Sequence, residues 1–288
     1  MTIPLANQWG TFRYNAAELA KPTNVEEVVA LVRRAAERGL RVKPFGGGHS
    51  FNAIIGTGGI AVDLSAMRNV LAIDLDNATM EVEGGMTICD IIEAGDLAGL
   101  HFPSLGSWHS QSIAGAIATS THGSSMTWGS LSDLVLAVEA VLADGSVVRY
   151  ESGEELRAFR CNLGHLGIVT KVKLQLTPAF WLHCSHETLP DEQGFAEIAE
   201  RSKAAEYVNM LWLPYLETAA IRTLNRTDVR KRNQASIDLE EAFTGKTRFG
   251  HTVEDLRNYL LGHTVLRAPK LLIPNYSPVI CFRVAGMV

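Results

Sequence analysis

The stretch Pro44-Phe45-Gly46-Gly47-Gly48-His49-Ser50 carries the strongest signal in this sequence of 288 residues. It continues residues 41–45, which are predicted to form a short strand. Three consecutive glycines allow positive φ values and a close approach of the backbone to a ligand, and their N–H groups can cradle a pyrophosphate. It is neither a dinucleotide fingerprint nor a Walker loop, because Phe51 replaces the third glycine and no Gly-Lys-Ser/Thr follows. A tight surface turn is the alternative interpretation.

A second polar stretch, residues 104–123, is rich in serine, threonine, glycine and histidine. Its centre, Ile113-Ala114-Gly115-Ala116-Ile117-Ala118, is small and apolar and predicts a closely packed helical turn, and hydroxyl groups at both ends can bond a polar ligand. It lies within a longer stretch without regular pattern, residues 101–130, and an irregular segment of that length is uncommon in a compact domain unless it is functional. A glycine-rich connector is the alternative. A third stretch, Leu163–Thr170, is weaker and favours a turn that leads into a buried strand.

The surrounding pattern combines short strands with few helices and predicts an α+β fold. Thr23-Asn24-Val25-Glu26 forms a capping box before an amphipathic helix, which ends at Gly39. The helix is expected to turn four apolar residues to one face: Val28, Leu31, Val32 and Ala35. A second helix is expected over residues 87–98. Strands are expected over residues 60–64, 70–75, 79–83, 134–142, 147–151 and 168–176.

The pattern changes after Pro178, where we place a domain boundary. Residues 1–178 are expected to form one domain and residues 179–288 a second. The second part has predicted strands over residues 180–188, 207–213 and 219–224 and a predicted helix over residues 191–205. Residues 225–250 are polar and basic, which predicts a mobile surface segment.

The composition excludes several classes of protein. With 47% hydrophobic and 20% charged residues, the chain is not wholly disordered. No run reaches the ~18 apolar residues of a membrane span, so no integral membrane segment is expected. A net charge of −5 and a pI near 6.0 argue against a nucleic-acid partner. Residues 1–10 lack the basic and apolar regions of a secretory signal, so none is expected.

The cysteines and histidines give no sign of a metal centre. The four cysteines, Cys89, Cys161, Cys184 and Cys281, lie far apart, so we expect reduced thiols and a cytoplasmic location, with peripheral attachment to a membrane left open. The nine histidines show neither His-x-His nor His-Glu-x-x-His spacing, so no metal site is expected. No Gly-x-Ser-x-Gly elbow supports a serine hydrolase.

Taken together, these segments resemble the flavin domain of the vanillyl-alcohol-oxidase type family, and within it the sugar-lactone branch of gulonolactone and arabinonolactone oxidases. The matching segments are Asn7–Gly10, Lys21–Val28, Gly47–Ser50, Met67–Leu71, Ser112–Gly115, Thr119–Gly123 and Leu166–Val169, with weaker matches at 206–207, 212–214 and 222–223. The resemblance implies a two-subdomain FAD-binding fold over residues 1–178, followed by a partial α+β substrate domain over residues 179–288. Gly48–Asn52 is equally similar to the related alditol oxidases.

The resemblance implies an FAD-dependent oxidoreductase. A hydride would pass from the CH–OH carbon of a sugar-1,4-lactone or polyol to flavin N5, and oxygen or another acceptor would reoxidise the flavin. His49 is implied as the covalent attachment point, through the 8α-methyl group, and Ser107 as a catalytic residue near the isoalloxazine. The residues implied around FAD are Pro44, Phe45, Gly46, Gly47, Gly48, His49, Ser50, Ser107, Ser112, Gly115, Thr119, Ser120, Thr121, His122 and Val169.

One family segment, His-Trp-x-Lys in the C-terminal part of these enzymes, has no counterpart in the sequence up to Val288. The substrate domain is therefore expected to be incomplete. Two alternatives to a lactone oxidase stay open: an alditol oxidase, and a non-catalytic flavoprotein that retains FAD. The residues leave open which sugar is oxidised and whether oxygen is the acceptor.

Overall fold

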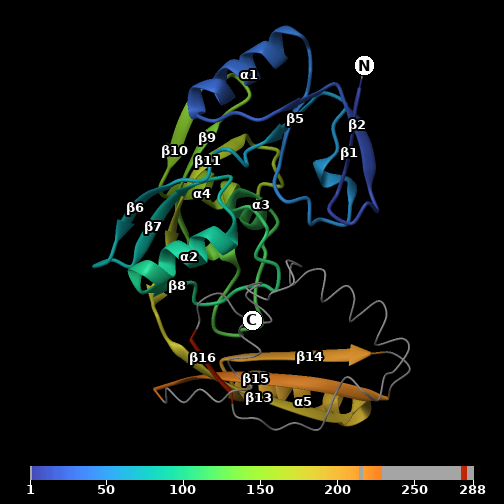
Figure 1. The fold of residues 1–288 in the computed structure, drawn as a ribbon, viewed down its shortest axis with the longest axis vertical. Coiled ribbons are helices and arrows are strands. Elements are labelled where there is room, and N and C mark those ends of the chain that lie inside the picture. Colours follow the sequence, from blue (N-terminus) through green and yellow to red (C-terminus); the bar gives the residue numbers. More distant parts are fainter. Residues whose placement is uncertain (1, 214–216, 229–279, 284–288) are drawn as a thin grey trace, which may run out of the picture. The chain divides into compact units, whose positions relative to one another are not determined.

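The computed structural model describes residues 2–213, 217–228 and 280–283 (Figure 1). The chain divides into two compact units. The first contains Met1–His122 and Gly129–Pro178, and the second contains Gly123–Trp128 and Ala179–Val288. The chain thus changes unit after Pro178. The segment Gly123–Trp128, which the sequence interpretation includes in the first domain, belongs to the second unit.

Two larger sheets form the first unit, and their mixture with helices confirms the α+β class. A three-stranded parallel sheet has the order β3-β5-β4, and a five-stranded antiparallel sheet has the order β10-β9-β11-β7-β6. The parallel strands are β3 (Glu18–Ala20), β4 (Val42–Phe45) and β5 (Ile60–Asp63). The antiparallel strands are β6 (Val70–Asp74), β7 (Thr79–Glu83), β9 (Val135–Val141), β10 (Val147–Tyr150) and β11 (Ile168–Gln175).

Short strand pairs and helices complete the first unit. The strand pairs are β1 (Ile3–Ala6) with β2 (Arg13–Ala16), and β8 (Leu100–His101) with β12 (Thr177–Pro178). The helices are α1 (Val25–Glu37), α2 (Ile88–Ala98), α3 (Ile113–Ala118) and α4 (Gly153–Phe159), with 3-10 turns at Ala53–Ile55 and Leu131–Leu134. Each predicted strand of this unit lies within one or two residues of an observed one.

Helix α1 begins one residue later than its predicted capping box. Its N-cap is Asn24, whose side chain accepts a hydrogen bond from the N–H of Glu27 at 2.9 Å. The Glu27 carboxylate accepts in turn from the N–H of Thr23 at 2.8 Å. Glu26 therefore does not close the box, because the third residue after the observed cap is Glu27. The predicted end is confirmed, since Gly39 follows the helix with φ of 61°.

The apolar face of α1 joins the two sheets into one core. Val28, Leu31, Val32 and Ala35 are all buried, as predicted. They belong to a cluster that also contains apolar residues from both sheets: Ile60, Val62, Val141 and Ile168. Burial of each Val or Leu side chain contributes roughly 1.5–3 kcal/mol. The position of α1 thereby fixes the parallel sheet against the antiparallel one.

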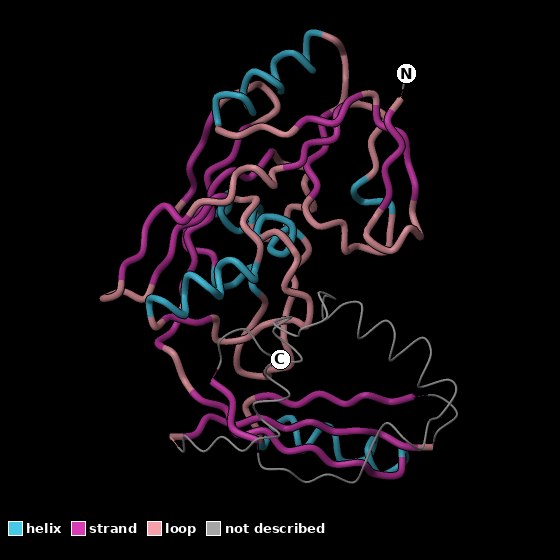
Figure 2. Tube along the Cα trace, in the orientation of Figure 1, coloured by secondary structure: helices cyan, strands magenta, loops and turns pink. Residues whose placement is uncertain are grey.

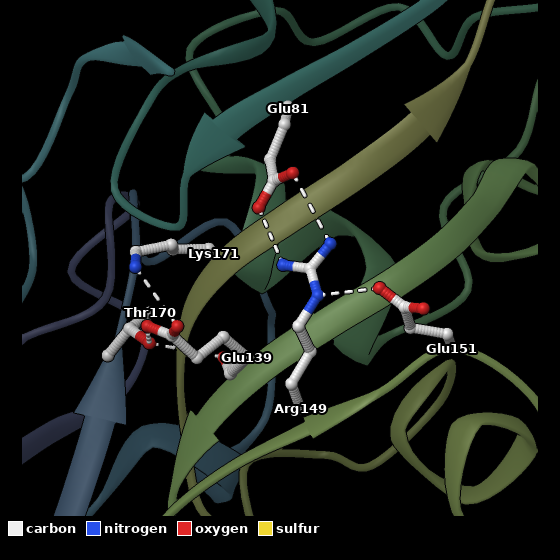
Figure 3. A network of polar contacts seen from close by, with 6 residues as sticks. All are labelled: Glu81, Glu139, Arg149, Glu151, Thr170 and Lys171. Carbon is white, nitrogen blue, oxygen red and sulfur yellow. Dashed lines mark hydrogen bonds and ion pairs between the residues drawn. The ribbon is translucent and has the colours of Figure 1, made fainter. Parts of the chain in front are cut away.

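Ion pairs and hydrogen bonds of charged side chains link strands of the antiparallel sheet (Figure 3). Arg149 on β10 forms ion pairs of 2.7 Å with Glu81 on β7 and with Glu151. Glu139 on β9 pairs with Lys171 at 3.0 Å and accepts a hydrogen bond from the Thr170 hydroxyl at 3.0 Å. The hydrogen bond to Glu81 is the largest cause of a raised pKa of Arg149. Because these groups are partly exposed, each pair contributes at most about 1 kcal/mol.

In its described residues, the second unit has a four-stranded antiparallel sheet with one long helix against it (Figure 2). The strand order is β14-β15-β13-β16. The elements are β13 (Trp181–Pro190), α5 (Asp191–Ala204), β14 (Tyr207–Leu213), β15 (Thr218–Thr227) and β16 (Ile280–Arg283). The predicted surface segment 225–250 is described only up to residue 228, where its first residues end β15; the rest of it lies outside the described residues.

Candidate functional site

A cavity of about 330 Å³ lies in the first unit, at the carboxyl ends of β4 and β5. These strands are parallel and pair Phe45 with Asp63, so the loops that follow them leave the sheet at the same edge. Of the sequence-predicted site residues, the cavity is lined by Pro44, Phe45, Gly46, Gly47, Gly48, His49, Ser50, Ser112, Gly115, Thr119 and Val169. Four others do not line it: Ser107, Ser120, Thr121 and His122.

The glycine loop offers backbone donors to the cavity. Within the described part of the chain, the N–H groups of Gly46, Gly47, Gly48 and Ser50 donate to no protein acceptor. Gly48 has φ of 69°, a value that favours glycine. Consecutive free N–H groups in a concave loop are a site for an anion such as a phosphate. The loop therefore fits a pyrophosphate better than it fits the tight surface turn of the alternative interpretation.

The N-terminal hairpin holds this loop in place. The N–H of Gln8 donates to the carbonyl of Gly48 at 2.9 Å. The side-chain amide of Asn7 donates to the carbonyl of Ser50 at 3.0 Å. Since Asn7 is 4% exposed, its bond to the loop is shielded from water. The carbonyls of Gly48 and Ser50 are thus bonded to the N-terminal hairpin.

Close packing explains two of the three glycines. A Cβ on Gly46 would lie 2.0 Å from Oγ of Ser112, and a Cβ on Gly47 would lie 2.9 Å from the carbonyl oxygen of Ser110. Real Cβ atoms almost never approach other atoms within 3.0 Å. A larger residue at either position would displace the segment 110–112. The glycine loop and that segment therefore form two adjoining walls of the cavity.

A second glycine pair at the cavity was missed at the level of sequence. Gly84 and Gly85 follow β7 directly. A Cβ on Gly85 would lie 1.8 Å from the carbonyl oxygen of Leu64, and one on Gly84 would lie 2.3 Å from that of Val169. The signal was available, because two glycines directly after a strand indicate a close backbone approach. Gly85 lines the cavity.

Helix α3 is the helical turn that the sequence predicts, and its Ala114, Gly115 and Ala118 line the cavity. Its N-cap is Ser112, whose hydroxyl accepts from the N–H of Gly115 at 3.3 Å. The N–H of Ile113 donates to the carbonyl of Met86 at 2.8 Å, which ties the start of α3 to the loop after β7. Thr119 ends the helix, and its hydroxyl donates to the carbonyl of Gly115 at 3.1 Å.

The third sequence stretch contributes more than its pattern predicts. It does form a turn that leads into a buried strand, β11, but Leu163, Gly164 and Gly167 also line the cavity. Lys43 of β4 holds the turn, because its ammonium donates to the carbonyls of Leu163 at 2.7 Å and Gly164 at 3.2 Å. Leu163 and Gly164 both have positive φ, of 52° and 66°. Lys43 lines the cavity too and was not among the predicted residues.

Lys43 and Asp63 are the charged residues that line the cavity. Burial lowers the pKa of Lys43. Burial alone would raise the pKa of Asp63, but hydrogen bonds from Lys21 and Ser65 outweigh it and the pKa is lowered. Lys21 forms an ion pair of 2.8 Å with this carboxylate. Asp63 is therefore ionised at neutral pH.

His49 lies at one wall of the cavity between polar and aromatic neighbours. Its Nε2 is 3.0 Å from Oγ of Ser110, and its ring stacks on Trp108 with centroids 5.9 Å apart. Trp108 packs edge-on against Trp9, which stacks on the exposed ring of Phe51. Ser110 lines the cavity and was missed because a lone serine in a serine-rich loop gives no distinguishing signal.

The four predicted residues outside the cavity lie in the loops before and after α3. Ser107 is exposed. Ser120 has φ of 54°. Thr121 accepts a hydrogen bond from the side chain of Gln111 at 3.3 Å, and His122 pairs with Ser130 in an isolated β-bridge. These contacts hold the irregular loop that follows α3.

Other kinds of site are not found in the described residues. They contain no group of His, Cys, Asp or Glu side chains placed to hold a metal ion. Among them, Cys89, Cys161 and Cys184 are free thiols. None of the described helices is long and apolar enough to cross a membrane.

Comparison with known proteins gives two family matches in succession. The model of the FAD binding domain family matches residues 16–151, and the model of the D-arabinono-1,4-lactone oxidase family matches residues 172–262. Together they cover the same order of parts that the resemblance in the sequence implies.

The curated relatives are likewise enzymes of sugar lactones and alditols. An L-gulono-1,4-lactone dehydrogenase of Mycobacterium tuberculosis is 31% identical over 210 residues, which are 73% of this chain and 49% of the relative. A putative D-arabinono-1,4-lactone oxidase of Neurospora crassa is 32% identical and covers 96% of this chain and 50% of its own. An alditol oxidase of Streptomyces is 37% identical over 62% of this chain and 43% of its own. The chain spans about half the length of the curated relatives it matches.

Solved structures share the fold at low identity. Cholesterol oxidase from B. sterolicum superimposes with a TM-score of 0.71 at 18% identity, over 93% of this chain and 56% of the other. Alkyldihydroxyacetonephosphate synthase gives a TM-score of 0.64 at 15% identity, over 72% of this chain and 48% of the other. The predicted FAD-binding fold is thereby confirmed.

Proposed function

Because the chain belongs to the FAD-binding oxidoreductases of the vanillyl-alcohol-oxidase type that include the sugar-lactone and alditol oxidases, we propose that it binds FAD and oxidises a CH–OH group of a sugar-1,4-lactone. Residues 1–178 would bind the cofactor, and residues 179–288 would form part of the substrate domain. The match of the lactone oxidase family to residues 172–262 supports this division.

The observation that carries the proposal is the glycine loop at the cavity. Its N–H groups without protein acceptors suit a pyrophosphate, and the close contacts at Gly46 and Gly47 leave room for backbone only. Ser112, Gly115 and Thr119 would bind ribityl and phosphate oxygens, and Val169 would contact the flavin through its backbone. The chemistry supplied by bound FAD is acceptance of a hydride from the substrate carbon at N5, with transfer of the electrons to oxygen or another acceptor.

The residues of this chain would bind and orient the cofactor. Asp63 is ion-paired with Lys21, and the Lys43 ammonium donates to the carbonyls of Leu163 and Gly164, so we expect the loop N–H groups to bind the phosphates. We assign the covalent attachment to His49, whose neutral imidazole is a competent nucleophile. The roles of Ser120, Thr121 and His122 beside the cofactor, and of Ser107 near the isoalloxazine, stay predictions of the sequence, as does a cytoplasmic location.

An alditol oxidase is the second candidate, favoured by the 37% identity to the Streptomyces enzyme. Initial rates with L-gulono-1,4-lactone, D-arabinono-1,4-lactone and an alditol, measured with oxygen and with an artificial electron acceptor, distinguish the two substrate classes. A protein that binds FAD but oxidises none of these compounds would support the third possibility, a non-catalytic flavoprotein.

The test of cofactor binding is the visible spectrum of the purified protein before and after acid precipitation. Flavin absorbance that stays with the pellet would support covalent FAD. His49→Ala should then release all flavin to the supernatant while it still binds FAD reversibly, because the glycine loop is unchanged. His183→Ala, in the second unit, is the matched control and should keep the flavin in the pellet. Acid-precipitable flavin in His49→Ala would refute the assignment of His49.

A further inference from the structure

We propose that Ser110 is a positioning residue, which holds the imidazole of His49 in the orientation needed for covalent attachment of FAD. This inference rests on the proposed function, in which His49 is the attachment point. It assigns a role to a residue that neither the sequence pattern nor the family matches single out.

The contact joins two segments that are 61 residues apart in the chain. Oγ of Ser110 is 3.0 Å from Nε2 of His49, and both residues line the cavity. The backbone of Ser110 is also close to the glycine loop, since its carbonyl oxygen would be 2.9 Å from a Cβ on Gly47. The backbone that carries the hydroxyl thus lies close against the glycine loop.

The backbone on either side of Ser110 is fixed by helix α2. The carbonyl of His109 accepts from the N–H of Cys89 at 2.9 Å, and the carbonyl of Gln111 accepts from the N–H of Ile88 at 3.0 Å. These donors are the first two residues of α2. These bonds hold the backbone of Ser110 in place beside His49, as a supporting residue of a reactive group requires.

Trp108 and Ser110 restrain the imidazole in different ways. The stacked indole, with an interplanar angle of 26°, fixes the plane of the ring. Stacking alone does not distinguish the two ring orientations related by rotation about the Cβ–Cγ bond. The hydrogen bond to Nε2 does, because the turned-over ring would present a carbon to the hydroxyl. Ser110 therefore selects which nitrogen faces which side of the cavity.

This selection matters for the covalent step. One imidazole nitrogen of His49 forms a bond to the 8α carbon of FAD, the carbon and the imidazole each lose one proton, and the two electrons of the broken C–H bond reduce the flavin. Dioxygen, the co-reactant, then takes these two electrons and two protons and becomes hydrogen peroxide. The bond can form only from a nitrogen aimed at that carbon, so the rate depends on the fraction of time the ring spends in one orientation.

The test compares the full chain with three variants: Ser110→Ala, Ser110→Thr and, as the matched control, the exposed Ser152→Ala. Each protein is freed of unattached flavin and mixed with FAD in air. Reversible binding is followed by quenching of FAD fluorescence, and covalent attachment by the fluorescent band on a denaturing gel over time. Loss of one hydrogen bond at an otherwise stacked ring should slow attachment in Ser110→Ala by about tenfold. Reversible affinity should fall by clearly less than the rate of attachment does.

Rescue separates positioning from a general structural effect. Ser110→Thr retains the hydroxyl and should attach FAD at nearly the rate of the unaltered protein, as should Ser152→Ala. Attachment at the unaltered rate in Ser110→Ala would overturn the inference while leaving His49 as the attachment point. Loss of reversible FAD binding in Ser110→Ala would overturn it as well, because Ser110 would then be part of the binding site. An unaltered protein that binds FAD and never attaches it would refute the assignment of His49 and this inference together.

Discussion

Replacement of Gly46 by alanine tests the close packing between the glycine loop and the N-cap of helix α3. The new methyl carbon would lie 2.0 Å from Oγ of Ser112 and 3.1 Å from its Cβ. Ser112 must therefore rotate, and the hydroxyl then loses its bond to the N–H of Gly115. Loss of an N-cap bond costs about 1 kcal/mol, and an unfavourable rotamer adds about 0.5–1.5 kcal/mol. We expect Gly46→Ala to destabilise α3 by roughly 2 kcal/mol in total.

A double-mutant cycle isolates this contact. Ser112→Ala alone should cost about 1 kcal/mol, because it removes the same cap. In the double variant the added methyl meets only a Cβ at 3.1 Å, which a shift of a few tenths of an ångström relieves. The double variant should therefore be little worse than Ser112→Ala, with a coupling energy of about 1–2 kcal/mol. Gly58→Ala is the matched control, since a Cβ there meets nothing within 4 Å.

Hydrogen exchange measured by mass spectrometry on a peptide that covers residues 113–118 reports the free energy of opening of α3. FAD affinity gives a second readout, because the rotated hydroxyl of Ser112 would enter the cavity and weaken binding. Additive effects of Gly46→Ala and Ser112→Ala, within about 0.5 kcal/mol, would refute the reasoning. So would a Gly46→Ala variant as stable as Gly58→Ala.

Two further predictions concern Lys43 at the cavity and the titration of His109. Lys43→Met should weaken FAD binding by roughly tenfold, because the carbonyls of Leu163 and Gly164 lose their donor and the turn shifts. Fluorescence titration with FAD measures this affinity. Arg149→Met is the control and should bind FAD normally, because the ion pairs of Arg149 lie on the sheet. Burial lowers the pKa of His109 below 6.5, so the folded state binds fewer protons than the unfolded state below that pH and stability falls on acidification. The protection of residues 104–112 from hydrogen exchange, measured relative to the intrinsic exchange rate at each pH, should therefore fall between pH 7 and pH 5, and less so in His109→Gln. An equal loss of protection in both proteins would contradict this assignment.

The fold can be predicted from the sequence where the spacing of apolar residues shows which face of a helix or strand is buried. The apolar spacing of Val28, Leu31, Val32 and Ala35 predicts α1 and its buried side, and α1 is found there. The predicted capping box begins at Thr23, one residue before the observed N-cap, because Thr23 and Asn24 are both good N-caps. Only the observed backbone, with Asn24 extended and Glu27 reaching back to Thr23, decides between them.

For the candidate site as well, local features can be predicted from the sequence, whereas contacts between distant segments cannot. The residues from Pro44 to Ser50 all line the cavity, and the sequence predicts them as one loop because glycine runs and a strand end are local features. Ser107 and Ser110 are both serines of one loop, and nothing in their neighbours tells which lines the cavity. The difference arises from the hydrogen bonds that His109 and Gln111 make to α2, which are contacts between segments.

The family can be predicted from short motifs and their order along the chain, and the α+β class and the glycine loop from local pattern, since each motif depends on residues within a few positions of one another. Tertiary structure alone decided that Lys43 holds the turn at Leu163, that Ser110 meets His49, and that Gly85 lies against Leu64. These contacts join residues that are distant in the chain, and each depends on how sheets and helices pack. Local rules of hydrogen bonding and periodicity extend over about one helical turn or one strand, so they cannot specify such pairs.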